Sequence, residues 1–78
     1  MTILTGEPIE VISSNAWCEA KVLRVYPKSA KIVFNYGGTW LRGKVLADRQ
    51  PRKLFRNGVY YFSALTDVRP MQTAPEPH

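Results

Sequence analysis

The stretch WCEAKVLRVYPKSAKIVFNYGG, residues 17–38, contains two strand patterns that face each other across a short turn. Residues 20–26 are rich in Val, Leu and Tyr, and residues 27–29 (PKS) supply turn chemistry. Residues 31–36 alternate polar and apolar side chains, so that one face is apolar. This stretch predicts a β-hairpin. Because a lone hairpin is marginal in water, we expect the remaining segments to cover its apolar face.

The apolar alternation changes phase within the first strand of this hairpin. Ala20 and Val22 share one face, but Val25 joins them only if the alternation slips by one residue near Leu23 and Arg24. Such a slip predicts a β-bulge or a sharp bend, which small barrels use to close their sheet.

Further strand patterns lie on both sides of the hairpin. Residues 7–13 and residues 39–46 are expected strands, and Gly43 leaves the register of the second one open. Asn57-Gly58 is the strongest two-residue hairpin signal, since both positions of a type I′ turn need a positive φ. We therefore expect a second hairpin, formed by residues 53–56 and 59–62.

The remaining segments connect or follow these strands. Residues 47–52 are polar and contain a proline, which predicts an exposed loop. Residues 63–65 are long enough for a single turn, and residues 66–69 for a last short strand. The end of the chain, residues 71–78, has two prolines and no apolar pattern, so we expect a disordered tail.

These patterns predict an all-β fold of about five or six strands, without an amphipathic helix. A small barrel or sandwich is expected, because closing the sheet removes exposed strand edges. The expected organisation is one domain over residues 1–70, followed by the tail. The residues expected in the core are Val11, Val22, Val25, Ile32, Phe34 and Val45, with Leu65 or Val68 closing the end.

Composition restricts the class of protein. A hydrophobic fraction of 45% and nine aromatic residues fit a folded domain. No apolar run approaches the roughly 20 residues that span a bilayer, and the first residues lack the layout of a signal peptide. Cys18 is the only cysteine, which excludes an intramolecular disulfide and agrees with a reducing compartment. We expect a soluble cytoplasmic protein without a membrane partner.

Few residues are suited to catalysis or to metal binding. The only histidine is His78 in the tail, so no imidazole is expected in an active site. The carboxylates are scattered, and none has the spacing of a ligand set. We therefore expect a non-enzymatic protein with no cofactor, no metal site and no catalytic residues.

The positive charge is concentrated in residues 42–56. This segment has six basic residues and one acidic residue, a net charge of +5. The rest of the chain has five basic and five acidic residues, so the segment holds the whole net charge of the protein. Such asymmetry indicates an anionic partner, although a charged segment can also be a solvated surface.

Aromatic residues accompany the basic segment, and this combination suits nucleic acid. Lysine and arginine contact phosphates, and aromatic rings stack on bases. The leading hypothesis is therefore a nucleic-acid-binding module, with DNA and RNA both open. The alternative is a protein–protein adaptor or regulator that binds an acidic or methylated peptide, and a homo-oligomer also stays open. The residues expected to bind the partner are Arg42, Lys44, Arg49, Arg52, Lys53, Arg56 and Tyr60.

Four short motifs occur in a recognisable order. They are Ile9-Glu10-Val11, then Trp17 with Ala20-Lys21-Val22 and Val25, then residues 32–37 (IVFNYG), and finally residues 65–70 (LTDVRP). Together they resemble the Tudor and agenet domains, which are strongly bent five-stranded barrels of the SH3-like kind. The resemblance covers residues 6–38 and 65–70 and implies a Tudor-like, SH3-like barrel. The basic segment and an extra hairpin lie between these two parts, where Tudor domains have a shorter connection.

The Tudor resemblance also implies a binding site. In that family an aromatic cage at one rim of the barrel binds methylated Lys or Arg through cation–π attraction. Trp17 and Tyr36 are the corresponding positions here, and Trp40 is a third candidate. Gly37 and Gly38 follow Tyr36, where such cages often carry an acidic residue.

A remote alternative is an enzyme. Ala16-Trp17 and residues 61–65 (YFSAL) are similar to the plasmid-encoded type II dihydrofolate reductases, which are also SH3-like barrels. That resemblance implies an active-site strand at residues 59–62. This chain has Val-Tyr-Tyr-Phe there and lacks the Gln that contacts substrate and cofactor in that family.

Overall fold

The computed structural model describes residues 8–52 and 54–71 of the chain. Every regular element in this part is a β-strand, which confirms the expected all-β class. There are seven strands instead of five or six, because both arms of the second hairpin and the short C-terminal segment all pair. The strands are β1 (Pro8–Ser13), β2 (Ala16–Tyr26), β3 (Ser29–Tyr36), β4 (Thr39–Leu46), β5 (Phe55–Arg56), β6 (Val59–Ser63) and β7 (Val68–Pro70).

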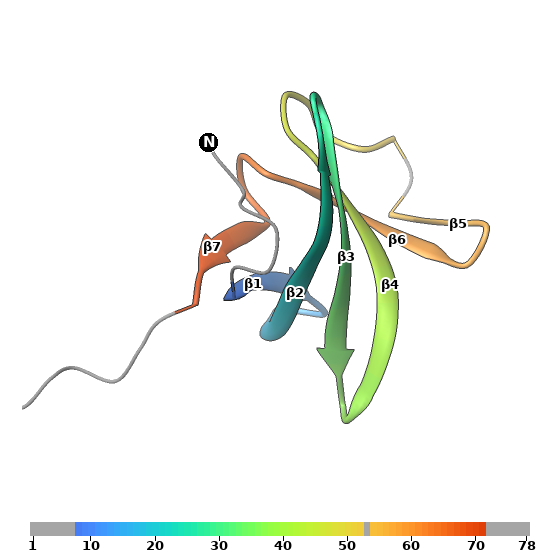
Figure 1. Ribbon diagram of the computed structural model, residues 1–78. Coiled ribbons are helices and arrows are strands. Elements are labelled where there is room, and N and C mark those ends of the chain that lie inside the picture. Colours follow the sequence, from blue (N-terminus) through green and yellow to red (C-terminus); the bar gives the residue numbers. More distant parts are fainter. Residues whose placement is uncertain (1–7, 53, 72–78) are drawn as a thin grey trace, which may run out of the picture.

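The seven strands form one curled sheet in the order β5-β6-β4-β3-β2-β1-β7. Figure 1 shows the long strands β2, β3 and β4 at its centre, with β1 and β7 on one side and β6 and β5 on the other. All neighbours are antiparallel except β4 and β6, which run parallel. A parallel pair needs a crossover. The segment after β4 supplies it by leading the chain into β5 before β6 begins.

Both predicted hairpins are present, and so is the predicted bulge. Residues 17–36 lie in the β2–β3 hairpin, and the register shifts between Val22 and Arg24, where the phase slip was expected. Asn57 and Gly58 have φ values of 54° and 77°, the positive pair that a type I′ turn requires. Local sequence therefore determines these features.

The core lies on one face of the curled sheet, here called the inner face. Phe34 at its centre is fully buried and meets the rings of Tyr60 and Phe62 edge-on, at centroid distances of 5.5 and 5.2 Å. Edge-to-face contacts of this kind stabilise a core beyond the area they bury. Gly43 lies beneath this cluster, because a Cβ there would stand 3.0 Å from Cγ1 of Ile32 and 3.1 Å from Cε2 of Phe62.

The predicted core is confirmed at five positions, and two positions are corrected. Val11, Val22, Ile32, Phe34 and Val45 are all buried. Val25 is 42% exposed. It lies opposite Ala30 and so faces inward, but β1 pairs only with residues 16–21 of β2 and does not reach it.

The end of the core is closed by Val68, which is partly buried, and not by Leu65, which is 67% exposed. The turn after β6 is held by a hydrogen bond from Ala64 N to Leu46 O of 2.9 Å. This bond directs Ala64 into the core, where it is 5% exposed, and leaves the next residue in solvent.

Some expectations fall outside the described residues. These are the disorder of residues 72–78 and the structure around Lys53. The described part contains no helix that is long and apolar enough to cross a membrane.

Replacing Phe34 with Ala should remove about 3–5 kcal/mol of unfolding free energy, because it leaves a cavity between β3 and β6. That loss is comparable with the whole stability of a small domain. Urea denaturation measures it. Phe55→Ala is the matched control, since the same atoms are removed from a ring that is 52% exposed. Equal losses for the two variants would contradict the central role of Phe34.

Replacing Gly43 with Ala should cost about 1–3 kcal/mol, since the new methyl group overlaps Ile32 and Phe62. Thr39→Ala, at the exposed start of the same strand, should change stability by less than about 0.5 kcal/mol. Thermal denaturation of both variants checks this. A Gly43→Ala protein as stable as the parent would show that the glycine is not needed for close packing.

Candidate functional site

The face of the sheet opposite the core, here called the outer face, collects basic side chains from several strands. Lys31 of β3 lies directly opposite Lys44 of β4. Tyr61 of β6 is the partner of Lys44 on its other side. Because residues opposite each other share a face, these three side chains project in the same direction. Strand pairing thus brings Lys31, which lies outside residues 42–56, next to the basic segment.

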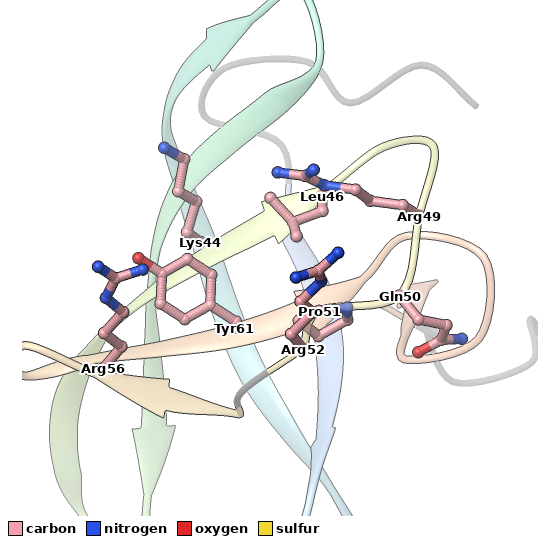
Figure 2. Close-up of a pocket in the computed structure, with 8 residues that line it drawn as sticks. All are labelled: Lys44, Leu46, Arg49, Gln50, Pro51, Arg52, Arg56 and Tyr61. Carbon is pink, nitrogen blue, oxygen red and sulfur yellow. The ribbon is translucent and has the colours of Figure 1, made fainter.

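Three depressions lie on this outer face, and Lys44 lines all of them. The first has a volume of about 640 Å³ and contains Lys44, Arg49, Arg52 and Arg56. Figure 2 shows these four side chains distributed around Leu46 and the ring of Tyr61. They come from β4, from the loop that follows it and from β5, so the crossover itself builds one wall.

The second depression, of about 740 Å³, lies between the tip of the β2–β3 hairpin and β6. Arg42 contributes to it, and its Nη2 atom lies 3.7 Å from where a Cβ of Gly58 would stand. The third, of about 250 Å³, joins the other two near Lys28 and Arg49. We call the combined recess the basic groove. Its charged lining consists of Lys28, Lys31, Arg42, Lys44, Asp48, Arg49, Arg52 and Arg56.

The electrostatic balance of the basic groove is strongly positive. Seven of these charged residues are basic and one is acidic, a net charge of +6. In the described ranges the one ion pair joins Arg69 Nε to Glu10 Oε1 at 2.9 Å. These residues belong to β7 and β1, at the edge of the sheet opposite β5 and β6. No basic residue of the groove is therefore neutralised by a carboxylate of this part of the chain.

The carboxylate of Asp67 stabilises a turn near the crossover. Asp67 accepts hydrogen bonds from the backbone N–H of Ser63, at 2.8 Å, and from the hydroxyl of Thr66, at 3.2 Å. These bonds hold the turn between β6 and β7. Asp67 therefore stabilises the fold on which the groove is built and does not line the groove.

Hydrogen bonds hold the walls of the basic groove in place. Ala47 N donates to Lys28 O at 3.0 Å, which ties the loop after β4 to the β2–β3 turn. The amide of Gln50 donates to the hydroxyl of Thr66 at 3.0 Å, and Figure 2 shows its side chain directed away from the depression. The arginines on this loop are therefore carried by a segment that is anchored on both sides.

The structure brings together most of the predicted binding residues. Lys44, Arg49, Arg52 and Arg56 share one depression, and Arg42 lies in the next. Lys53 lies outside the described residues.

Tyr60 is not part of the basic groove. Its ring faces inward and contacts Phe34 and Phe55, at centroid distances of 5.5 and 4.5 Å. Tyr61 lines the groove in its place. Because neighbouring strand residues alternate between faces, only one of the two tyrosines can lie on the outer face.

Other groove residues were missed by the sequence analysis. Lys28 and Lys31 were counted with the neutral remainder of the chain, and Tyr26 was assigned only to a strand. The signal that could have found Lys31 is Gly37-Gly38, a two-residue connection with φ values of 61° and 93°. Such a connection makes β3 and β4 a hairpin, and its register sets Lys31 opposite Lys44.

The three residues of the expected aromatic cage do not form one. Trp17 lies under the Arg69 guanidinium, with the ring centroid 4.1 Å from Cζ, and Trp40 lies under Lys21, 5.0 Å from Nζ. The hydroxyl of Tyr36 donates to Ser14 Oγ at 3.0 Å. The strand alternation puts Tyr36 on the inner face with Phe34 and puts both tryptophans on the outer face. Each tryptophan already holds a cation of this chain.

In the part of the chain that the structure describes, the pKa of Cys18 is clearly shifted. Burial raises the pKa of its thiol above the ordinary value, and the nearby Glu10 carboxylate raises it further. The thiol is therefore protonated at neutral pH, as in a small core residue. In residues 8–52 and 54–71, no group of three His, Cys, Asp or Glu side chains is placed to hold a metal ion.

Comparison with known proteins leaves the basic groove as the main indication of function. The chain matches no protein-family model, no curated protein and no solved structure.

Proposed function

We propose that this protein is a non-enzymatic module that binds nucleic acid through the basic groove. The observation that carries the proposal is the set of seven basic residues around Tyr61, with one carboxylate among them and no ion pair to the described part of the chain. A phosphate backbone is a regular array of negative charge that would satisfy all of them.

The cost of assembling these charges supports a polyanionic partner. Like charges gathered in one recess repel one another and reduce stability. The described part of the chain has four acidic residues, and two of them, Glu10 and Asp67, are already bonded away from the groove. A surface that only needed solubility would gain from interspersed carboxylates. An anionic ligand removes the repulsion when it binds.

We also propose that the fold is a modified SH3-like barrel related to the Tudor type. Support comes from the run β4-β3-β2-β1-β7, in which β2 bends at its bulge and the last strand returns to pair with β1. The crossover and the β5–β6 hairpin are then an addition to that barrel, and this addition carries one wall of the basic groove.

Binding should be governed by counterion release. If the first depression, which contains Lys44 and three arginines, contacts about four phosphates, log K should fall with log salt at a slope near −3 to −4. Replacing Arg49 and Arg52 together by Ala should reduce the magnitude of the slope by about 1.5–2, since two contacts are lost. Both side chains are exposed and lie outside the strands, so the fold should be unaffected. Fluorescence anisotropy with DNA and RNA at several salt concentrations measures this.

The matched control is Lys21→Ala with Arg69→Ala. It removes the same charge from two positions that do not line the basic groove. Its slope should stay within about 0.5 of the parent value. Equal effects of the two double variants would show non-localised attraction and contradict the proposed site. Failure to bind DNA or RNA at low salt, with binding to an acidic peptide, would replace nucleic acid by an acidic protein partner.

A further inference from the structure

The two larger depressions of the basic groove differ in their lining. One is surrounded by Lys44 and three arginines, whereas the other adds Tyr26, Pro27 and Val59 to its cations. Their volumes, about 640 and 740 Å³, fall within the range of sites that enclose small organic groups. Tyr61 and Lys44 line both, so an aromatic ring and a cation stand where the two depressions meet.

The ring of Tyr61 is held in place yet left without an aromatic partner in the described residues. The ring contacts there join Phe34 to Tyr60, Phe34 to Phe62 and Phe55 to Tyr60. The backbone N–H of Tyr61 donates to Leu54 O at 2.8 Å, which fixes the strand that carries the ring. In Figure 2 the ring of Tyr61 lies among the side chains of Lys44, Arg52 and Arg56.

A second ring lies across the groove at the hairpin tip. Tyr26 is 41% exposed, and the guanidinium of Arg24 lies 5.6 Å from its ring centroid. It lines the same depression as Tyr61. Because Arg24 lies over one face of this ring, the groove offers the ring of Tyr61 and the other face of Tyr26, with basic side chains between and beside them.

This combination distinguishes between the two forms of nucleic acid. A duplex presents phosphates on its outside and keeps the faces of its bases stacked inside, so rings recessed among cations cannot reach them. A single strand exposes its phosphates and its base faces together, and each stacked base contributes binding energy. An apolar, aromatic lining beside a cationic wall has a use only in the second case.

We propose, on the basis of the nucleic-acid function proposed above, that the basic groove binds single-stranded DNA or RNA. One base stacks on Tyr61, and the next lies against Tyr26. The phosphates between and beyond them contact Lys44 and the arginines of the first depression. Because stacking uses the face of a base and not its edge, binding is tolerant of sequence.

The test compares a single strand with a duplex by fluorescence anisotropy at one salt concentration. The probes are labelled oligo(dT) and oligo(U) of about 12 nucleotides and a blunt duplex of the same length. Both single strands should bind at least about 10-fold more tightly than the duplex. Tyr61→Ala should weaken single-strand binding by about 5- to 100-fold, the equivalent of about 1–3 kcal/mol per stacked base. Duplex binding should change less than about 2-fold.

Two further variants separate stacking from folding. Tyr61→Phe keeps the ring and should bind a single strand within about 2-fold of the parent. Tyr26→Ala alters an exposed residue at the end of a hairpin, so it should fold normally and weaken single-strand binding by about 3- to 30-fold. Melting curves for all variants establish that each is folded at the temperature of the assay.

The outcomes distinguish this inference from the function on which it depends. Duplex binding as tight as single-strand binding, unaffected by Tyr61→Ala and Tyr26→Ala, would overturn the single-strand inference and leave nucleic-acid binding standing. Loss of all affinity for the three probes at low salt would overturn both. A clear difference between oligo(dT) and oligo(U), with both weakened by Tyr61→Ala, would support the inference and show which of the two strands the groove prefers.

Discussion

The packing of Phe34 against the rings of Tyr60 and Phe62 is the contact on which the rest of the structure depends. It joins the central hairpin to β6, which is far along the chain and reaches the sheet only by a crossover. Gly43 makes the approach feasible, since a side chain there would overlap Phe62. This inner contact packs β6 against the hairpin on the same side as its parallel pairing with β4.

The same packing determines the outer face. With Tyr60 and Phe62 directed inward, the period-2 alternation of a strand directs Tyr61 outward, next to Lys44. The chain between β4 and β6 must then pass over the end of the sheet, and it carries Arg49, Arg52 and Arg56 with it. The core and the basic groove are therefore two consequences of one strand arrangement.

The charges of the basic groove are arranged in a way that a stability argument alone does not explain. The ion pair of the described part, between Arg69 and Glu10, lies at the edge of the sheet farthest from β5 and β6. The groove concentrates its basic residues near a single acidic one, Asp48. Repulsion of this kind is tolerated where a partner compensates for it, and this supports a surface built for an anionic ligand.

The sequence by itself determined the local structure. The β2–β3 hairpin, the bulge after Val22, the Asn57-Gly58 turn and the extent of β4 follow from alternation and turn chemistry within a few residues. The concentration of charge in residues 42–56 is also visible without a structure. These features depend on neighbours in the chain, which is why sequence patterns predict them.

Only the tertiary structure decided which residues meet. Residues 59–62 (VYYF) are all apolar, so their alternation has no readable phase, and packing on Phe34 was needed to show that Tyr61 faces the groove and Tyr60 does not. Trp17, Tyr36 and Trp40 fail to form a cage because they divide between two faces of the sheet. Val25 is a similar case. The sequence predicted which face of β2 it lies on, but not that β1 ends before it and leaves it exposed. Pairing between distant strands depends on the whole sheet, and no local pattern encodes it.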